Sequence, residues 1–176
     1  MVIDSNQSDG NWRLEGLGAE GPETKLKDKL MLFGQFVGDW EIVDARYMQK
    51  DGSWAEMRGE VHFGWILGGT AIQDVWLGHK LGVEQIGMRG TTIRFYDSKI
   101  DAWCSTWLSP LKAIVQFFIG RKIEDTIVLE LQNPIEFPEH WVFSKITPTS
   151  FRWHAEETRD AGKTWVITEE MQLCRK

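Results

Sequence analysis

Cysteine is scarce in this chain, with only Cys104 and Cys174 among 176 residues. Two cysteines so far apart in the sequence build neither a disulfide framework nor a zinc site. Both lie in strand-like segments, where a free cysteine is usually a small buried apolar side chain. The four histidines are not spaced as metal ligands either. We therefore predict no metal site and no cofactor.

Clusters of positive charge and long apolar runs are also missing. The chain has 20 lysines and arginines against 26 acidic residues, a formal net charge of −6, whereas nucleic-acid binding needs clustered positive charge. No apolar run approaches the ~20 residues of a membrane-spanning helix. Residues 1–21 lack the basic start and apolar run of a signal peptide. The sequence thus predicts a cytoplasmic protein whose partners include neither nucleic acid nor a membrane.

No established catalytic motif occurs in the sequence. It contains no Gly-x-Ser-x-Gly elbow, no His-Glu-x-x-His pair and no glycine-rich phosphate loop. The motifs therefore leave open whether the protein is an enzyme.

Tryptophan, by contrast, is abundant: the chain has 10 Trp and 9 Phe but only 2 Tyr. With 176 residues it has the length of one domain and can bury a core without disulfide or metal support. Large rings fill wide interior spaces well, although most buried aromatic side chains simply pack against one another. The tryptophans therefore either line a cavity or fill the core.

The N-terminal part of the chain divides into two segments. Residues 1–21 are rich in Gly, Asp, Asn and Ser without a sustained period, which predicts a flexible arm. From Pro22 to Val37, apolar residues recur at three- and four-residue spacing, as on one face of an amphipathic helix. We predict a helix over 22–37 that plugs one end of a domain formed by residues 22–176.

After the helix, apolar residues recur at every second position, which is typical of strands with one face on a core. Turn sequences such as Lys50-Asp51-Gly52-Ser53 separate these strands at intervals of about 8–12 residues. No helix-length segment lies between them, so consecutive strands must run antiparallel. The expected strands cover residues 40–48, 55–65, 70–77, 91–96, 102–108, 112–119, 126–132, 141–146, 151–158 and 164–174.

This pattern predicts an all-β fold, an antiparallel up-and-down β-barrel of about ten strands with one short N-terminal helix. Closure is favoured because it removes the exposed edges that an open sheet of this size leaves.

Four short motifs carry a family resemblance: Gly38-Asp39-Trp40, Trp65-Ile66-Leu67-Gly68-Gly69-Thr70, Tyr96-Asp97 followed by Trp103 and Trp107, and Gly162-Lys163-Thr164-Trp165. Together they resemble the bacterial lipocalin-like (calycin-type) β-barrel proteins of the DUF1579 type, over roughly residues 33–176. The resemblance implies an antiparallel barrel and little about activity. In lipocalins an arginine at the end of the last strand packs over the first-strand indole, so the resemblance also implies contact between Arg175 and Trp40.

The haem-binding nitrobindins are a related group of barrels with a histidine ligand on a late strand. His154 stands at a comparable place in this chain, but its alternation with Trp153 and Ala155 directs it outward. The glycines that follow the tryptophan in the nitrobindin start are also missing after Trp40. We therefore predict no haem.

Several charged residues fall on strand faces that are otherwise apolar. Asp74 lies between Ile72 and Trp76 on one such face. A charged side chain inside a barrel must be paired or hydrogen-bonded, so we expect Asp74 to meet Arg94 or Arg46. Desolvation raises the pKa of a carboxyl group, which makes Asp74 the best single catalytic candidate.

Four further charged residues fall on apolar strand faces, and for these, as for Asp74 and Arg94, the sequence leaves two placements open, inside or outside the barrel. Asp44 and Arg46 continue the apolar face of the first strand, and Glu157 and Glu169 fall on the apolar faces of two late strands. The alternative is a slip of register at a β-bulge, which places such side chains outside. The predicted ligand-binding residues are Trp40, Asp74, Trp76, Arg94, Trp103, Trp107, Trp153 and Glu157.

Three functions suit such a barrel. The one we rank first is the binding of a small apolar or aromatic molecule inside it. The second is a small-barrel enzyme, a lyase, isomerase or cyclase, whose general acid and base are Asp74 and either Glu157 or Glu169. The third is a filled structural barrel that forms a homodimer. Residues 114–119, apolar on both faces, are the candidate contact unless the helix or the arm covers them.

Overall fold

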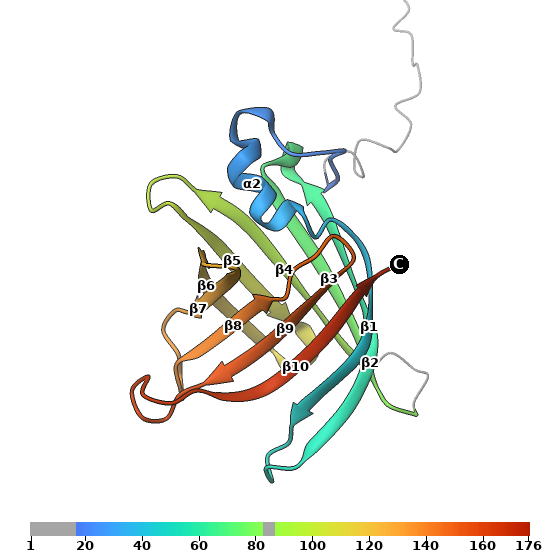
Figure 1. The fold of residues 1–176 in the computed structure, drawn as a ribbon, viewed down its shortest axis with the longest axis vertical. Helices are drawn as coiled ribbons and strands as arrows, with labels where there is room; N and C mark the ends of the chain where they lie inside the picture. Colours follow the sequence, from blue (N-terminus) through green and yellow to red (C-terminus); the bar gives the residue numbers. More distant parts are fainter. Residues whose placement is uncertain (1–16, 83–86) are drawn as a thin grey trace, which may run out of the picture.

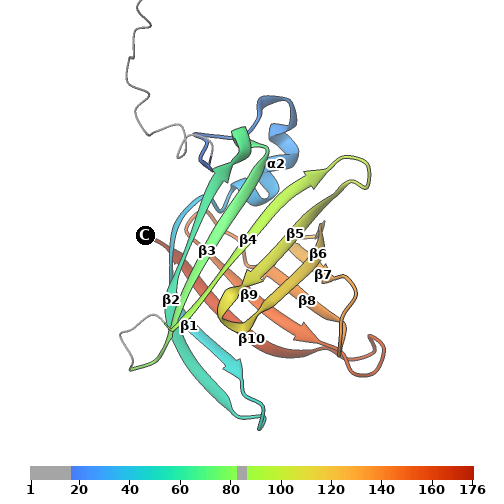
Figure 2. The same cartoon turned by 180° about the vertical axis from the view of Figure 1, so that it is seen from behind.

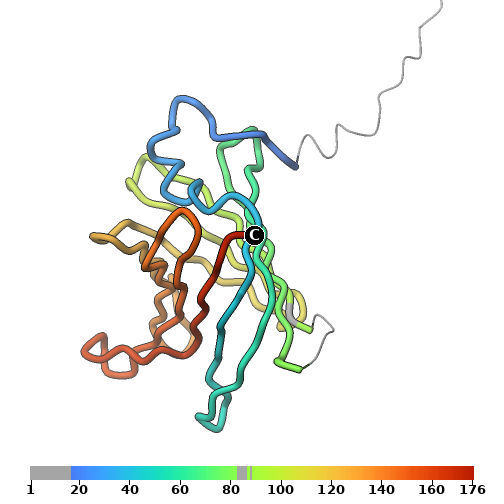
Figure 3. Tube along the Cα trace, turned by 45° about the vertical axis from the view of Figure 1, so that its right-hand side comes forward, coloured from blue at the N-terminus to red at the C-terminus, as the bar shows by residue number. Residues whose placement is uncertain are grey.

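Ten antiparallel strands close into a barrel in the computed structural model of the protein, which describes residues 17–82 and 87–176 (Figure 1). The strands are β1 (Gly38–Met48), β2 (Trp54–Ile66), β3 (Ala71–Lys80), β4 (Met88–Asp97), β5 (Ala102–Ser109), β6 (Ile114–Ile123), β7 (Thr126–Leu131), β8 (Glu139–Ser144), β9 (Ser150–Glu157) and β10 (Val166–Arg175). Each strand pairs with the next along the chain, and Figure 3 shows β10 returning beside β1. The predicted all-β barrel is confirmed.

Alternation along the strands decides which side chains face the interior. On β2, Val61, Phe63 and Trp65 are buried, while the side chains between them are more exposed. Ile127 and Leu129 are buried in the same way on β7. Because successive side chains of a strand point to opposite faces, this pattern places one apolar core inside the barrel.

A β-bulge in β1 reverses this alternation part-way along the strand. The register of β1 with β10 shifts between Ile42 and Asp44, and the extra residue of a bulge turns the following side chains to the opposite face. Ala45 is therefore buried, whereas the side chain of Asp44 is 84% exposed. Arg46 also lies outside, where it pairs with Glu170 of β10. The expectation that Asp44 and Arg46 face the interior is wrong, and the bulge is the reason.

The helical segment is shorter than the expected range of 22–37. A short 3-10 helix, η1 (Thr24–Leu26), leads into α2 (Lys27–Gly34). The Glu23 carboxylate caps this start by accepting hydrogen bonds from the backbone N–H groups of Lys25 and Leu26. After α2 the chain turns at once to enter β1, which ends the helix before Val37.

α2 lies across one end of the barrel (Figure 1). Its side chains Leu30 and Phe33 are fully buried there. Upstream of it, the N–H of Ala19 donates to the carbonyl of Trp65, so the described part of the predicted arm contacts β2. Residues 1–16, which make up most of that arm, lie outside the described residues. Within residues 17–82 and 87–176, no helix is long and apolar enough to cross a membrane.

Two connections fall elsewhere than expected. The strand expected over 112–119 continues as β6 to Ile123, and the turn to β7 is made at Glu124, which has a φ of 52°. The connection left between the expected strands 70–77 and 91–96 is shorter, because β3 continues to Lys80 and β4 begins at Met88. In both places the strand pairing extends past residues that are common in turns.

Candidate functional site

The barrel encloses a cavity of about 490 Å³. It reaches the surface at the end where β1 and β5 finish and β4 and β6 begin, since Met48, Arg89, Leu111 and Ile114 are among its lining residues. The other end is closed by α2. The cavity is therefore a pocket with a floor, a wall and one mouth.

Aromatic side chains form the floor. Phe33 of α2 makes an edge contact with Trp103, at 4.9 Å between ring centroids, and Trp40 makes one with Phe151 at 4.7 Å. Trp40 and Trp103 are 0% and 2% exposed, and neither lines the cavity. Both were expected in the ligand site. Their place is the core, because they stand at the end of the barrel that α2 fills.

Above the floor, Asp74 of β3 forms an ion pair with Arg94 of β4. Both side chains are at most 5% exposed, and both border the cavity. Burial raises the pKa of the Asp74 carboxyl group, and the charge of Arg94 opposes this rise. The Arg94 guanidinium also lies 5.2 Å from the ring centroid of Phe33. Of the two arginines expected to pair with Asp74, Arg94 does so, whereas Arg46 pairs with Glu170 on the outside of the barrel.

Four indoles form the next layer, which we name the tryptophan belt: Trp76, Trp107, Trp141 and Trp153. Successive rings meet edge-to-face, with centroid distances of 6.3, 5.6 and 5.4 Å, an arrangement that aromatic pairs prefer. A Cβ atom at Gly90 would come within 1.9 Å of the Trp107 ring, so the glycine provides the space that this indole occupies.

Trp141 is the member of the belt that was missing from the predicted set. It is only 8% exposed and lies two residues from Phe143 on the same face of β8. The alternation of Trp141 with Phe143 was the available signal for it.

Three carboxyl groups surround the cavity nearer its mouth, and we name them the carboxylate ring: Glu139, Glu157 and Glu169. The carboxylate of Glu139 accepts hydrogen bonds from Nε1 of Trp141 at 2.5 Å and from Nε2 of Gln116 at 3.2 Å. Burial raises the pKa of Glu139.

Glu169 has the most perturbed environment of this ring. Burial, reinforced by the charge of Glu139, raises the pKa of Glu169 to about 7, although Lys112 lowers it. A carboxyl group with a pKa near neutrality can both donate and accept a proton under physiological conditions. Sequence reasoning named Glu157 and Glu169 but missed Glu139, because the strand that carries Glu139 begins two residues earlier than expected.

His154 is not among the residues that line the cavity, whereas its neighbours Trp153 and Ala155 are. Its Nε2 lies 3.4 Å from Glu156. Burial and the charge of Arg152 lower the pKa of His154. In the described residues, no group of three or more His, Cys, Asp or Glu side chains is placed to hold a metal ion.

β4, β5 and β6 lie toward the viewer in Figure 2. The outer face of β4 and β6 carries exposed apolar side chains. Val115 is 69% exposed, Phe95 47% and Phe117 41%, while Phe118 points inward and is fully buried. α2 lies at the end of the barrel and not over this face. The prediction that residues 114–119 form a homodimer contact remains a prediction.

Two solved structures share this architecture. The S-type phycobiliprotein lyase CPES from Guillardia theta matches with a TM-score of 0.58 and 13% sequence identity, over 88% of this chain and 98% of the lyase chain. Rv2717c from M. tuberculosis matches with a TM-score of 0.60 and 14% identity, over 84% of this chain and 97% of its own. The chain has a lipocalin-like barrel fold.

This likeness is one of fold alone, because the identities are low. No protein-family model and no curated protein matches the chain. The narrower resemblance to the DUF1579 type is therefore not confirmed.

Proposed function

We propose that the barrel binds a small, largely apolar aromatic molecule inside the tryptophan belt. The observation that carries this proposal is that four indoles surround open space instead of filling it. A volume of about 490 Å³ lies within the range of small-molecule sites, which are mostly apolar with a few polar groups. A barrel filled by its own side chains, the third function considered from the sequence, does not account for this space.

A fluorescent probe tests the proposal directly. N-Phenylnaphthylamine is uncharged, aromatic and dim in water, and an apolar site makes it bright. We expect saturable binding, with energy transfer from the tryptophans to the probe. Replacing Trp107 by Leu removes one wall of the belt and weakens binding about ten-fold or more, the loss expected for a stacking ring. Trp54→Leu is the matched control, because Trp54 lies outside the cavity and is 38% exposed.

Two results contradict the binding function. One is the absence of saturable probe binding by the native protein. The other is equal affinity in the Trp107→Leu and Trp54→Leu variants when both retain the native circular-dichroism spectrum. Native mass spectrometry after mild purification provides independent support if it detects the protein with a small molecule still bound.

A second candidate function is catalysis in the same cavity, as a lyase or isomerase. Glu169, with a pKa of about 7 beside the tryptophan belt, is the observation that favours it. One structural neighbour of the same fold is a phycobiliprotein lyase, so the fold accommodates at least one enzyme. Glu169→Gln is expected to stop conversion of a molecule that copurifies with the protein while leaving its binding intact. If conversion continues in this variant, Glu169 is not the acid or base.

A further inference from the structure

The three carboxyl groups of the carboxylate ring repel one another. Glu139 and Glu157 are register partners on β8 and β9, and like charges directly opposite each other on a sheet are destabilising. Burial raises the pKa of Glu139 and of Glu169, and the charge of a neighbouring carboxylate adds to the rise, Glu157 for the former and Glu139 for the latter. In the described part of the chain, none of the three forms an ion pair. An occupant of the cavity that brings a positive charge relieves this repulsion.

The basic side chains that border the cavity do not cancel this negative charge. Arg89 and Lys112 are exposed at the mouth, whereas the three glutamates are half-buried. Water and salt screen exposed charges more strongly than buried ones. Burial accordingly raises the pKa of Glu169 to about 7 even though the charge of Lys112 lowers it. Deeper in the cavity, the charges of Asp74 and Arg94 match each other. The field near the carboxylate ring therefore favours a cation.

The tryptophan belt favours a cation as well, and it lies directly below the ring. Trp141 follows Glu139 by two residues on β8, both line the cavity, and Nε1 of Trp141 donates to the Glu139 carboxylate. Two residues of a strand span about 7 Å, a short distance for a small ligand to bridge. The face of an indole attracts positive charge more strongly than that of any other aromatic side chain. A ligand with its rings in the belt can thus hold a cationic group close to both indoles and carboxylates.

We propose that the cavity takes an amine in which a short alkyl chain links an aromatic ring to an ammonium group. The ring lies within the tryptophan belt, and the ammonium group points toward the mouth and donates hydrogen bonds to the carboxylates of Glu157 and Glu169. Glu139 already accepts from Trp141 and Gln116, so its charge acts on the ligand from beside these two. This ligand class and orientation rest on the proposed binding function and add to it.

Three naphthalene derivatives substituted at the same ring position test this class. Naphthylmethylamine carries the ammonium group, ethylnaphthalene has nearly the same shape without charge, and naphthoate carries the opposite charge. Displacement of N-phenylnaphthylamine measures the affinity of each at pH 8, where Glu169 is mostly ionised and an alkylamine is still protonated. The amine is expected to bind about ten-fold or more tightly than ethylnaphthalene, the difference expected for a hydrogen bond between charged groups together with a cation–π contact. Naphthoate is expected to bind most weakly.

Two variants assign this preference to the carboxylates. Glu169→Gln and Glu157→Gln each keep the shape of the side chain and remove its charge, so in each the ratio of amine to hydrocarbon affinity is expected to fall several-fold. Glu130→Gln is the matched control, because Glu130 lies on the exposed face of β7 and is not among the residues that line the cavity. The affinity for ethylnaphthalene in each variant shows whether the cavity itself is intact.

Equal or weaker binding of the amine relative to the hydrocarbon overturns the proposal, because the carboxylate ring then gives a cation no advantage. Tighter binding of naphthoate than of the amine overturns it as well. If Glu169→Gln or Glu157→Gln has the same ratio as Glu130→Gln, the ammonium group does not lie between the two carboxylates and the assignment is wrong. These failures differ from failure of the binding function itself, in which N-phenylnaphthylamine alone shows no saturable binding.

Discussion

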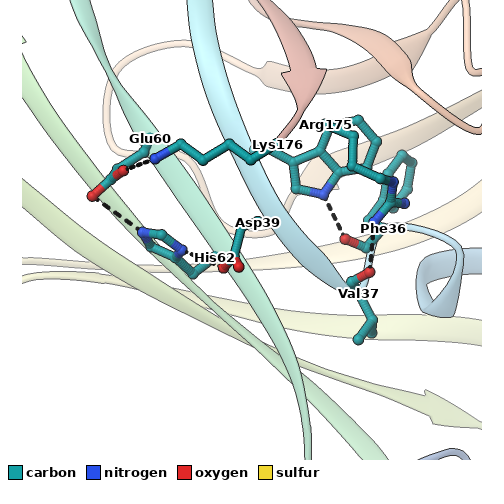
Figure 4. Close-up of polar contacts among 8 residues, drawn as sticks. Phe36, Val37, Asp39, Glu60, His62, Arg175 and Lys176 are labelled. Carbon is teal, nitrogen blue, oxygen red and sulfur yellow. Dashed lines mark hydrogen bonds and ion pairs between the residues drawn. The ribbon is translucent and has the colours of Figure 1, made fainter.

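The guanidinium of Arg175 lies over the indole of Trp40, with Cζ 4.2 Å from the ring centroid. The two residues are register partners on β10 and β1, so their contact joins the last strand to the first. Arg175 also donates to the carbonyl oxygens of Val37, Gln35 and Pro148 at 2.8–2.9 Å, and Figure 4 shows the bond to Val37. The expected contact between Arg175 and Trp40 is confirmed. It closes the barrel and ties the end of the helical segment to it.

Loss of this side chain should destabilise the fold. Arg175→Ala removes both the ring contact and three hydrogen bonds from a charged donor, which together predict a loss of about 1–3 kcal/mol in the free energy of unfolding. Arg175→Lys keeps the charge but not the planar fork, so an intermediate loss is expected. Urea denaturation measures both variants. The exposed Lys122→Ala variant controls for loss of one positive charge, and equal midpoints for it and Arg175→Ala would show that the contact is unimportant.

A second contact near this end of the barrel makes stability depend on pH. Nδ1 of His62 lies 2.6 Å from Asp39, and Nε2 lies 3.3 Å from Glu60, which also pairs with Lys176 (Figure 4). The hydrogen bond with Asp39 is the main cause that raises the pKa of His62 above its ordinary value of 6.5. The folded protein then holds its proton to higher pH than the unfolded chain does.

His62 therefore stabilises the fold fully below pH 6.5, and this contribution is lost as the pH rises through the raised pKa. His62→Gln is expected to flatten the fall in melting temperature between about pH 6 and pH 8. His79→Gln is the control, because among the described residues its ring has one hydrogen bond, with the carbonyl oxygen of Lys80, and no ion pair with a carboxylate. The same slope in native protein and His62→Gln contradicts the assignment.

The sequence predicted the fold and the inner faces well because alternation reports directly on inside and outside. Asp74 and Trp76 were placed on the inner face of their strand by this pattern, and both line the cavity. For Arg94, which stands between Ile93 and Phe95, the pattern left the face open, and the structure turns it inward while Phe95 lies outside. Alternation does not report depth along the barrel axis. Trp40 and Trp103 consequently looked equivalent to the lining residues, although they stand at the end that α2 fills.

Backbone irregularities were the second reason why the sequence placed some residues wrongly. The bulge in β1 inserts one residue into an otherwise regular strand between Ile42 and Asp44. The apolar positions change phase there, from Trp40 and Ile42 to Ala45 and Tyr47, and this signal was overlooked. Glu139 was missed for a related reason, since strand ends depend on pairing with a neighbouring strand and not on local pattern. The β8–β9 pairing that includes Glu139 and Glu157 brings two members of the carboxylate ring together.

The pKa of Glu169 is raised, whereas most paired carboxyl groups in folded proteins have a lowered pKa. The pH dependence of stability that follows from it is therefore the reverse of the usual one. Between its ordinary value of 4.5 and the folded value of about 7, the folded protein binds more protons than the unfolded chain. Stability therefore falls as the pH rises through this interval. Glu169→Gln removes the cost of ionisation and is expected to stabilise the protein at pH 8 by about 3 kcal/mol, with little effect near pH 5.

Chemical denaturation at the two pH values measures this effect. Glu130→Gln on the exposed face of β7 is the matched control and should change stability little at either pH. A destabilised Glu169→Gln variant at pH 8 would mean that the ionised carboxylate has a favourable partner in the cavity.

A substitution at Gly90 tests whether the position of the Trp107 indole in the tryptophan belt determines ligand binding. Gly90→Ala places a methyl group where the Trp107 ring lies, since the added Cβ comes within 1.9 Å of it. The indole must move, and the register partner of Gly90 is Trp76, another member of the belt. We expect the ring to shift into the cavity and weaken N-phenylnaphthylamine binding about ten-fold, an effect of steric displacement. Gly64→Ala is the control, because a Cβ there meets nothing within 4 Å. Unchanged probe affinity in a folded Gly90→Ala protein would show that Trp107 does not form the wall of the site.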